Sequence, residues 1–118
     1  MINKIDMAKL TNEKIKEYSL LECMYHDAYF PAALVDKCRD ILLELCYKIE
    51  AEKPDKEGLY KLTHYATDKL NGLQDEFESS GSEIETVARE CLAADFLFIA
   101  NAYGFEADIE KLVENREW

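Results

Sequence analysis

The feature that most constrains the fold is a long apolar stripe between Pro31 and Pro54. Apolar side chains recur there at intervals of three and four residues, which places them on one face of an α-helix. The residues of the stripe are Leu34, Val35, Cys38, Ile41, Leu42, Leu45, Cys46 and Ile49. Pro31 suits the first position of a helix, where its missing N–H would be unpaired, and Pro54 disfavours helix at the residue before it. The stripe therefore predicts one amphipathic helix over 32–52.

The rest of the chain indicates further helices joined by short connections. The spacing of apolar residues predicts helices over 12–25, 56–79 and 107–114, and another that follows Ser82 and ends at Tyr103. No segment alternates as a strand would, and only four Gly and two Pro interrupt the 118 residues. The expected fold is all-α: a single compact bundle of about five antiparallel amphipathic helices.

Local signals mark the connection before the helix that ends at Tyr103. Gly81 and Gly104 suit the left-handed position that terminates a helix, with Phe105 packing back after Gly104. Ser82 and Glu85 have the spacing of a capping box, in which each side chain accepts a free backbone N–H. Together these signals predict a helix end followed at once by a helix start.

The charge of the chain is strongly negative and unevenly distributed. There are 14 Lys and Arg residues against 25 Asp and Glu, a net charge of −11. Residues 75–118 hold 3 basic and 12 acidic side chains, whereas residues 1–74 hold 11 and 13. Such a field repels nucleic acid and anionic membranes and attracts basic partners. An acidic surface that serves solubility alone is the other interpretation.

Four stretches are distinctive in combination: "YFPAALVDK", "LYKLTHYATDKLN", "GSEIETVARECLAADFLFIANAYGF" and "ADIEKLVENREW". They resemble a small bacterial family known as domain of unknown function 5713. The resemblance covers 18–118, a single helical domain, and leaves 1–17 outside as an N-terminal extension. It implies a small, intracellular, helical protein, and it carries no catalytic residue, cofactor or partner.

Asp95 lies near the middle of the most apolar stretch of the chain, 88–105, on the face that should be buried. A buried carboxylate is costly unless it is paired, and burial raises its pKa. A structural acid that fixes the position of its helix and a pocket carboxylate with a functional role both fit this pattern. A different rotation of the helix would instead place Asp95 at the surface.

His64 is predicted to face water or a second helix, because it lies far from the apolar face of its own helix. It is either an exposed histidine without a role or a hydrogen-bond partner for Asp95 or for a ligand. An enzyme would need Asp95 with His64, or with Glu90, around one cavity. Asp95, His64 and Glu90 are therefore the candidate buried polar or pocket residues.

A candidate interface lies where the first two predicted helices meet. It consists of Tyr25, His26, Tyr29 and Phe30, which form either a hydrophobic corner or a binding surface. Glu22 is spaced to share a helix face with His26, but neither histidine has the Glu-x-x-His spacing of a di-iron bundle. No metal or other cofactor is predicted.

The cysteines show no metal-binding spacing. Cys38 and Cys46 would lie about 12 Å apart on one helix, too far for a disulfide. With Cys91 they are predicted to be buried free thiols of a reducing compartment.

The sequence favours a non-enzymatic protein-interaction module that binds a basic partner. Small immunity proteins and antitoxins provide an analogy in size, charge and helicity alone. The alternative is a small-molecule-binding protein or enzyme with a pocket near Asp95 and His64. A charged N-terminus without an apolar core, and the lack of a long apolar run, make the cytoplasm the expected location. Neither nucleic acid nor membrane is expected as a partner.

Overall fold

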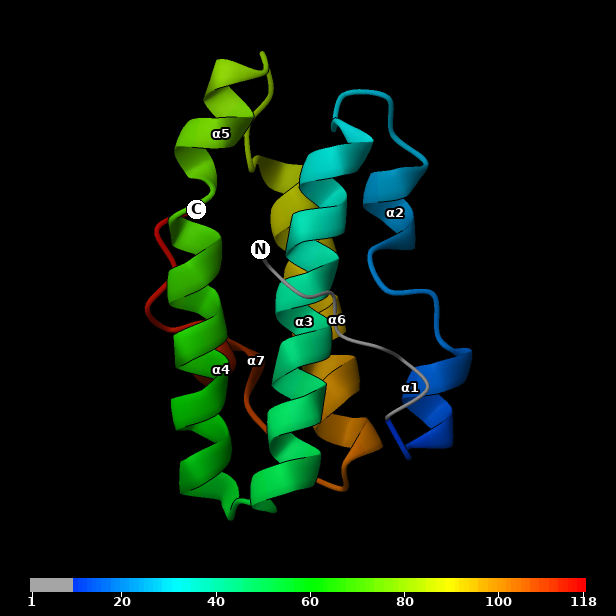
Figure 1. Cartoon of the computed structure of the whole chain (residues 1–118). Helices are drawn as coiled ribbons and strands as arrows, with labels where there is room; N and C mark the ends of the chain where they lie inside the picture. The colour runs from blue at the N-terminus through cyan, green and yellow to red at the C-terminus, as the bar shows by residue number, and fades with distance from the viewer. Residues whose placement is uncertain (1–9) are drawn as a thin grey trace.

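α3 (Ala32–Glu52) contains the predicted apolar stripe, in a computed structural model that describes residues 10–118. Every stripe residue is buried except Ile41, which is half-buried. α3 ends at Lys53, whose φ of 47° turns the chain before Pro54. The Asp55 carboxylate then accepts a hydrogen bond of 2.8 Å from the Gly58 N–H, which begins α4 (Lys56–Asn71). α3 and α4 therefore lie side by side as an antiparallel pair (Figure 1).

α6 (Thr86–Ala102) is the other central helix and lies behind α3 in Figure 1. On one side of these two helices are α4 and the short α7 (Ile109–Leu112). On the opposite side are α1 (Glu13–Glu17) and α2 (Glu22–Tyr25). α6 is apolar nearly all round because it has neighbours on both sides.

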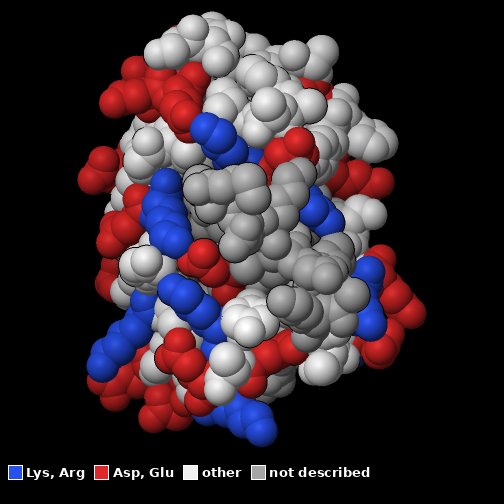
Figure 2. Space-filling view, in the orientation of Figure 1, with Lys and Arg blue, Asp and Glu red and all other residues white. Residues whose placement is uncertain are grey.

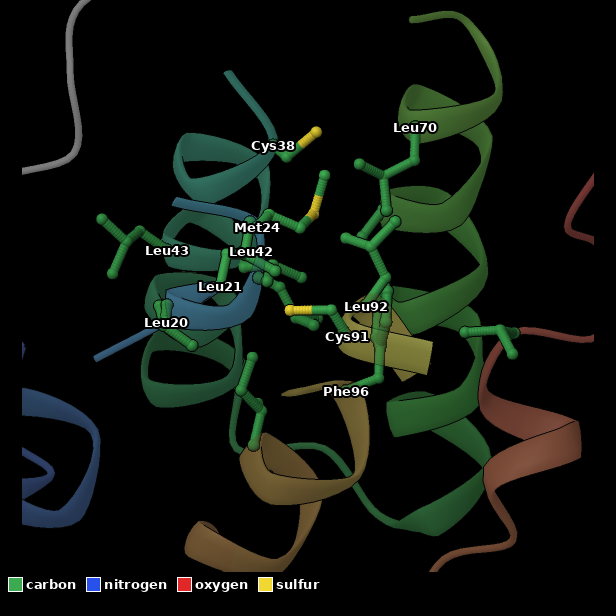
Figure 3. Packing of buried hydrophobic residues seen from close by; sticks show 14 of the residues in the cluster. Leu20, Leu21, Met24, Cys38, Leu42, Leu43, Leu70, Cys91, Leu92 and Phe96 are labelled. Atoms are coloured by element: carbon green, nitrogen blue, oxygen red, sulfur yellow. The ribbon is translucent and has the colours of Figure 1, made fainter. Parts of the chain in front are cut away.

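The core forms where these helices meet. Figure 3 shows Cys91, Leu92 and Phe96 of α6 among apolar side chains from the neighbouring helices, including Leu42 and Leu70. The described residues contain helices and no strand. The all-α compact bundle predicted from the sequence is confirmed.

Two of the predicted helices are each divided in two. The helix expected over 12–25 stops at Tyr18 and resumes as α2 after Leu21, which has a left-handed φ of 58°. A tertiary contact causes this break, because the Leu21 N–H donates to Asp95 and not to a carbonyl of its own helix. The helix expected over 56–79 ends at Gly72, a weak helix former, and continues after a tight turn as α5 (Gln74–Ser79).

The two predicted glycine termini are confirmed. Gly81 and Gly104 have φ values of 77° and 86°, and the following N–H groups reach back across each helix end. Ser82 N–H donates to Phe77 O at 2.8 Å, and Phe105 N–H donates to Ala100 O at 2.9 Å. These bonds are those of a Schellman motif.

The predicted capping box is wrong. α6 begins at Thr86, Glu85 is its N-cap without a side-chain hydrogen bond, and the Ser82 hydroxyl is buried with no partner among the described residues. Ser82 belongs to the end of α5, because its N–H already closes that helix.

One of the three cysteines expected to be free thiols forms a disulfide. Cys91 is bonded to Cys23 across 68 residues of sequence, with the two Cα atoms 6.2 Å apart. Cys38 and Cys46 are free and buried, as predicted. Residues 1–9 of the N-terminal extension lie outside the described part. Within residues 10–118, no helix combines the length and apolar content that crossing a membrane requires.

Candidate functional site

Asp95 is buried on α6 and holds the chain between α1 and α2 in place. Its side chain is 3% exposed. The Tyr18 hydroxyl donates to one carboxylate oxygen at 2.8 Å, and the Leu21 N–H donates to the other at 2.6 Å. The Tyr18 ring also stacks on Phe98 of the same helix, with ring centroids 3.8 Å apart. Asp95 therefore fixes where the N-terminal segment sits on α6.

This contact explains an unusual backbone conformation. Leu21 is a non-glycine residue in the left-handed region, which costs about 1–2 kcal/mol. A hydrogen bond to a carboxylate is about twice as strong as a neutral one, and it offsets this cost. In this conformation the Leu21 N–H points at Asp95, and Leu21 is the N-cap of α2.

Burial sets the electrostatics of this contact. Burial raises the pKa of Asp95, while the Leu21 N–H and the Tyr18 hydroxyl act in the opposite direction. Burial and the neighbouring carboxylate raise the pKa of Tyr18 to about 12, so its hydroxyl remains a donor. A ligand could reach Asp95, which is 3% exposed, only by displacing groups that cover it.

His64 lies on the other side of the bundle from α2 and has different partners. Its Nε2 lies 2.6 Å from the carbonyl oxygen of Lys111, and because a carbonyl only accepts, Nε2 carries the proton. The Glu114 carboxylate is 3.8 Å from the same nitrogen. Asn115 donates to the His64 carbonyl oxygen at 2.9 Å. His64 thus fastens the C-terminal segment to α4 and is not among the groups that contact Asp95.

Glu90 is exposed and lies at a shallow cleft of about 230 Å³ between α6 and the C-terminal segment. Arg89 and Arg116 also line this cleft. Asp95 and Glu90 both belong to α6, but Asp95 is buried and Glu90 is exposed, while His64 lies on α4. The contacts of these three residues therefore do not form a common acid–base group.

The four residues of the candidate interface differ in exposure. Tyr29 is 44% exposed and Tyr25 38% exposed, whereas Phe30 is buried and packs edge-to-face with the Tyr29 ring. The Tyr25 hydroxyl donates to Asp36, and burial together with that carboxylate raises its pKa. His26 is exposed beside Glu22, with 3.9 Å between its Nε2 and the nearest carboxylate oxygen of Glu22. Phe30 thus belongs to the core, and the other three residues face outward.

An open groove of about 470 Å³ lies between the α2–α3 loop and the start of α6. Two of its residues, Tyr29 and Val87, are exposed and contribute apolar surface. The other three are the carboxylates Asp27, Glu83 and Glu85, and we call this set of five residues the acidic groove. No ion pair joins any of the three carboxylates to a Lys or Arg among those found in the described residues.

A second acidic cleft, of about 350 Å³, adjoins the acidic groove, because Glu83 and Glu85 line both. Its lining also includes Glu78, Glu117, the largely buried Trp118 and one cation, Arg89. Figure 2 shows acidic side chains gathered at the upper left of the molecule, where Figure 1 places α5. Negative charge therefore continues from the acidic groove towards α5.

Sequence reasoning missed two residues that line clefts, Val87 at the acidic groove and Glu50 at a separate cleft. Val87 gave a weak signal, as an apolar residue in the first turn of α6 next to the polar Thr86. Glu50 gave none: its carboxylate accepts hydrogen bonds from Thr11, Asn12 and Tyr103, beside a cleft of about 410 Å³. Burial would raise the pKa of Glu50, but these donors outweigh it and lower the pKa. Glu50 therefore stays ionised and fastens the start of the described chain to α3.

Comparison with known proteins identifies a family. Residues 14–118 match DUF5713, a family of unknown function. The chain belongs to this family. The match begins at residue 14 and so includes most of α1, whose Ile15 is fully buried. No curated protein and no solved structure matches the chain. In residues 10–118, no three side chains of the metal-binding types gather at one place.

Proposed function

We propose that this member of the DUF5713 family is a protein-interaction module that binds a basic partner at the acidic groove. One observation carries the proposal: exposed apolar surface occurs at the same place as three carboxylates that form no ion pair with a Lys or Arg of the described residues. Tyr29 and Val87 are 44% and 40% exposed, beside Asp27, Glu83 and Glu85. An acidic surface that served solubility alone would not need this apolar component.

The chemistry of the acidic groove fits a Lys- or Arg-containing segment. Carboxylates on both walls would attract the cationic heads, while the Tyr29 ring would accept an aliphatic stem or a cation over its face. Tyr is enriched at protein interfaces because it joins a large apolar area to a polar tip. The net charge of −11 would in addition speed the encounter with a basic partner.

A pocket formed by Asp95 and His64 has less support. Both carboxylate oxygens of Asp95 accept internal hydrogen bonds, and the His64 Nε2 is used by Lys111. Binding there would have to break contacts that hold the fold. We therefore place the interaction at the acidic groove.

The proposal is tested by affinity capture from a lysate of the native cell, with a variant that changes the acidic groove alone. The bait pair is the wild type and a Glu83→Gln, Glu85→Gln, Tyr29→Ala variant. A control bait, Asp75→Asn with Glu106→Gln, removes the same number of charges at exposed positions outside the groove. We expect one basic protein to bind the wild type and the control bait but not the groove variant.

Salt provides the second readout of the same experiment. Charge-steered binding weakens when the ionic strength rises, so the captured protein should be lost at high salt. Equal capture by the groove variant would contradict the proposed site. Capture of no basic protein at low salt would contradict the proposed function.

A further inference from the structure

The disulfide between Cys23 and Cys91 joins an exposed residue to a buried one. Cys23 lies on α2, a helix of four residues, and is exposed. Cys91 lies on α6 and is 3% exposed. Figure 3 shows Cys91 among apolar side chains that include Leu21 and Met24. The two halves of this bond therefore differ in their access to solvent.

Other contacts hold α2 in place beside the disulfide. The Leu21 N–H donates to Asp95, and the side chains of Leu20, Leu21 and Met24 are buried against the core. Cleavage of the S–S bond would leave these contacts intact. Cys91 would then stay next to Cys23, since the two Cα atoms are only 6.2 Å apart.

We infer that this disulfide is a thiol-exchange site, in which Cys23 takes up an incoming thiol and Cys91 restores the bond. A thiolate RS⁻ attacks the sulfur of Cys23, because exchange needs access to the sulfur under attack. A new S–S bond forms between RS and Cys23, and the Cys23–Cys91 bond breaks. Its electron pair leaves on Cys91, which takes a proton from water.

The mixed disulfide has two fates. Cys91 can return its proton to hydroxide and, as a thiolate, attack Cys23, expel RS⁻ and restore the original bond. Alternatively, a second RS⁻ attacks the RS sulfur, releases RSSR and leaves Cys23 as a thiolate. In this second route two thiols are oxidised to one disulfide, and the protein disulfide is reduced to two thiols.

The charge around Cys23 selects the class of thiol. Glu22 precedes Cys23, Asp27 follows it by four residues, and the whole chain has a net charge of −11. Anionic thiols are repelled by this field, whereas cationic thiols are attracted. The site therefore favours small thiols that carry no net negative charge. This inference does not depend on the basic protein partner.

The experiment compares two thiols of similar size and opposite charge. The oxidised wild-type protein is incubated with 2-aminoethanethiol or 3-mercaptopropionate, quenched with acid and mapped by mass spectrometry. We expect the adduct on Cys23, with a rate constant per unit of thiolate at least threefold higher for 2-aminoethanethiol at low salt, because the thiolate is the attacking species. Equal rate constants per unit of thiolate would overturn the charge selectivity, and an adduct on Cys91 would overturn the assignment of Cys23. Four free thiols in the unreduced protein would overturn the site itself.

Two controls show that the exchange occurs in the folded protein at Cys23. A native-state pulse of N-ethylmaleimide should leave the buried thiols of Cys38 and Cys46 unlabelled. If they are labelled as fast as exchange proceeds, exchange follows global unfolding and the inference fails. In Cys91→Ser, cystamine should give a stable adduct on Cys23. In the matched Cys23→Ser variant, Cys91 should react at least tenfold more slowly, and equal rates would contradict the inference.

Discussion

The N-terminal and C-terminal segments of the described chain are attached to the central helices in different ways. Residues 10–30 are held on α6 by a few concentrated links. These are the disulfide of Cys23, the buried carboxylate of Asp95 and the stacking of Tyr18 on Phe98. Each link ends on a buried or half-buried residue of α6, so the loss of one should have a large effect.

Residues 107–118 are held on α4 by many small links. Asn115 donates to the His64 carbonyl and to the Asp68 carboxylate, and Asn71 donates to the Asn115 carbonyl. The Glu117 N–H donates to the Asn71 side chain. Most of these groups are partly exposed, so water can replace a lost partner. This comparison indicates that two short segments of similar helical content can differ greatly in how much stability a single substitution removes.

The largest effect is expected at the disulfide. Cys23→Ser opens a loop of 68 residues, and removal of such a cross-link lowers the free energy of unfolding by about 4 kcal/mol. Urea unfolding of the oxidised wild type and of the variant measures this change in the free energy of unfolding. Reduced wild type is the control and should match the variant. A change below about 1 kcal/mol would show that the other N-terminal contacts carry the attachment.

The next largest effect is expected at Asp95. Asp95→Ala leaves the buried Leu21 N–H without a partner and removes the acceptor of Tyr18, which lowers the free energy of unfolding by about 3 kcal/mol. Asp95→Asn keeps an acceptor for Leu21, and its amide can donate to the Tyr18 oxygen. Its cost should therefore be about 1 kcal/mol. Equal costs for the two variants would show that Asp95 acts through its charge and not through these hydrogen bonds.

Asp95→Asn also gives a pH test. The pKa of Asp95 is raised in the folded protein, so the native state binds this proton more tightly than the unfolded chain does. The stability contributed by Asp95 should fall as the pH rises from about 4, the unfolded value, through the folded value. Above that value it stays constant. The free energy of unfolding of the wild type minus that of Asp95→Asn, measured at several pH values, should fall over this pH range and then stay constant.

What sequence reasoning could predict was local. The stripe on α3 follows from the spacing of residues within one helix. The two helix ends follow from the presence of glycine, which tolerates the left-handed φ observed at Gly81 and Gly104. These features depend on neighbours a few residues apart. The all-α fold could therefore be read from periodicity alone.

What it missed depends on distant partners. Leu21 breaks the first predicted helix because its N–H meets Asp95, 74 residues later. Cys91 looked like a core thiol because its partner lies 68 residues away. The acidic groove also joins distant parts, with Tyr29 from one wall and Glu83 from the other. No local pattern in the sequence predicts these contacts between distant residues.

A smaller effect is expected in the C-terminal segment. Asn115→Ala removes hydrogen bonds of 2.9 Å to His64 and 2.7 Å to Asp68. Because both acceptors are partly exposed and can bind water, the free energy of unfolding should fall by about 1 kcal/mol. Asp68→Ala is a matched variant that removes one of the two acceptors and should cost less. A loss as large as that of Asp95→Ala would break the comparison between the two segments.

The smallest effect is expected for Arg116→Gln. Arg116 lies 3.6 Å from the mostly exposed Glu110 and stacks loosely near Trp118, with 5.8 Å to the ring centroid. An exposed ion pair contributes about 0–1 kcal/mol, and salt weakens it further. The variant should therefore unfold within about 0.5 kcal/mol of the wild type, and the gap should close at high salt. A larger, salt-independent loss would mean that Arg116 acts through its packing on Trp118, and that the C-terminal segment also has a concentrated attachment.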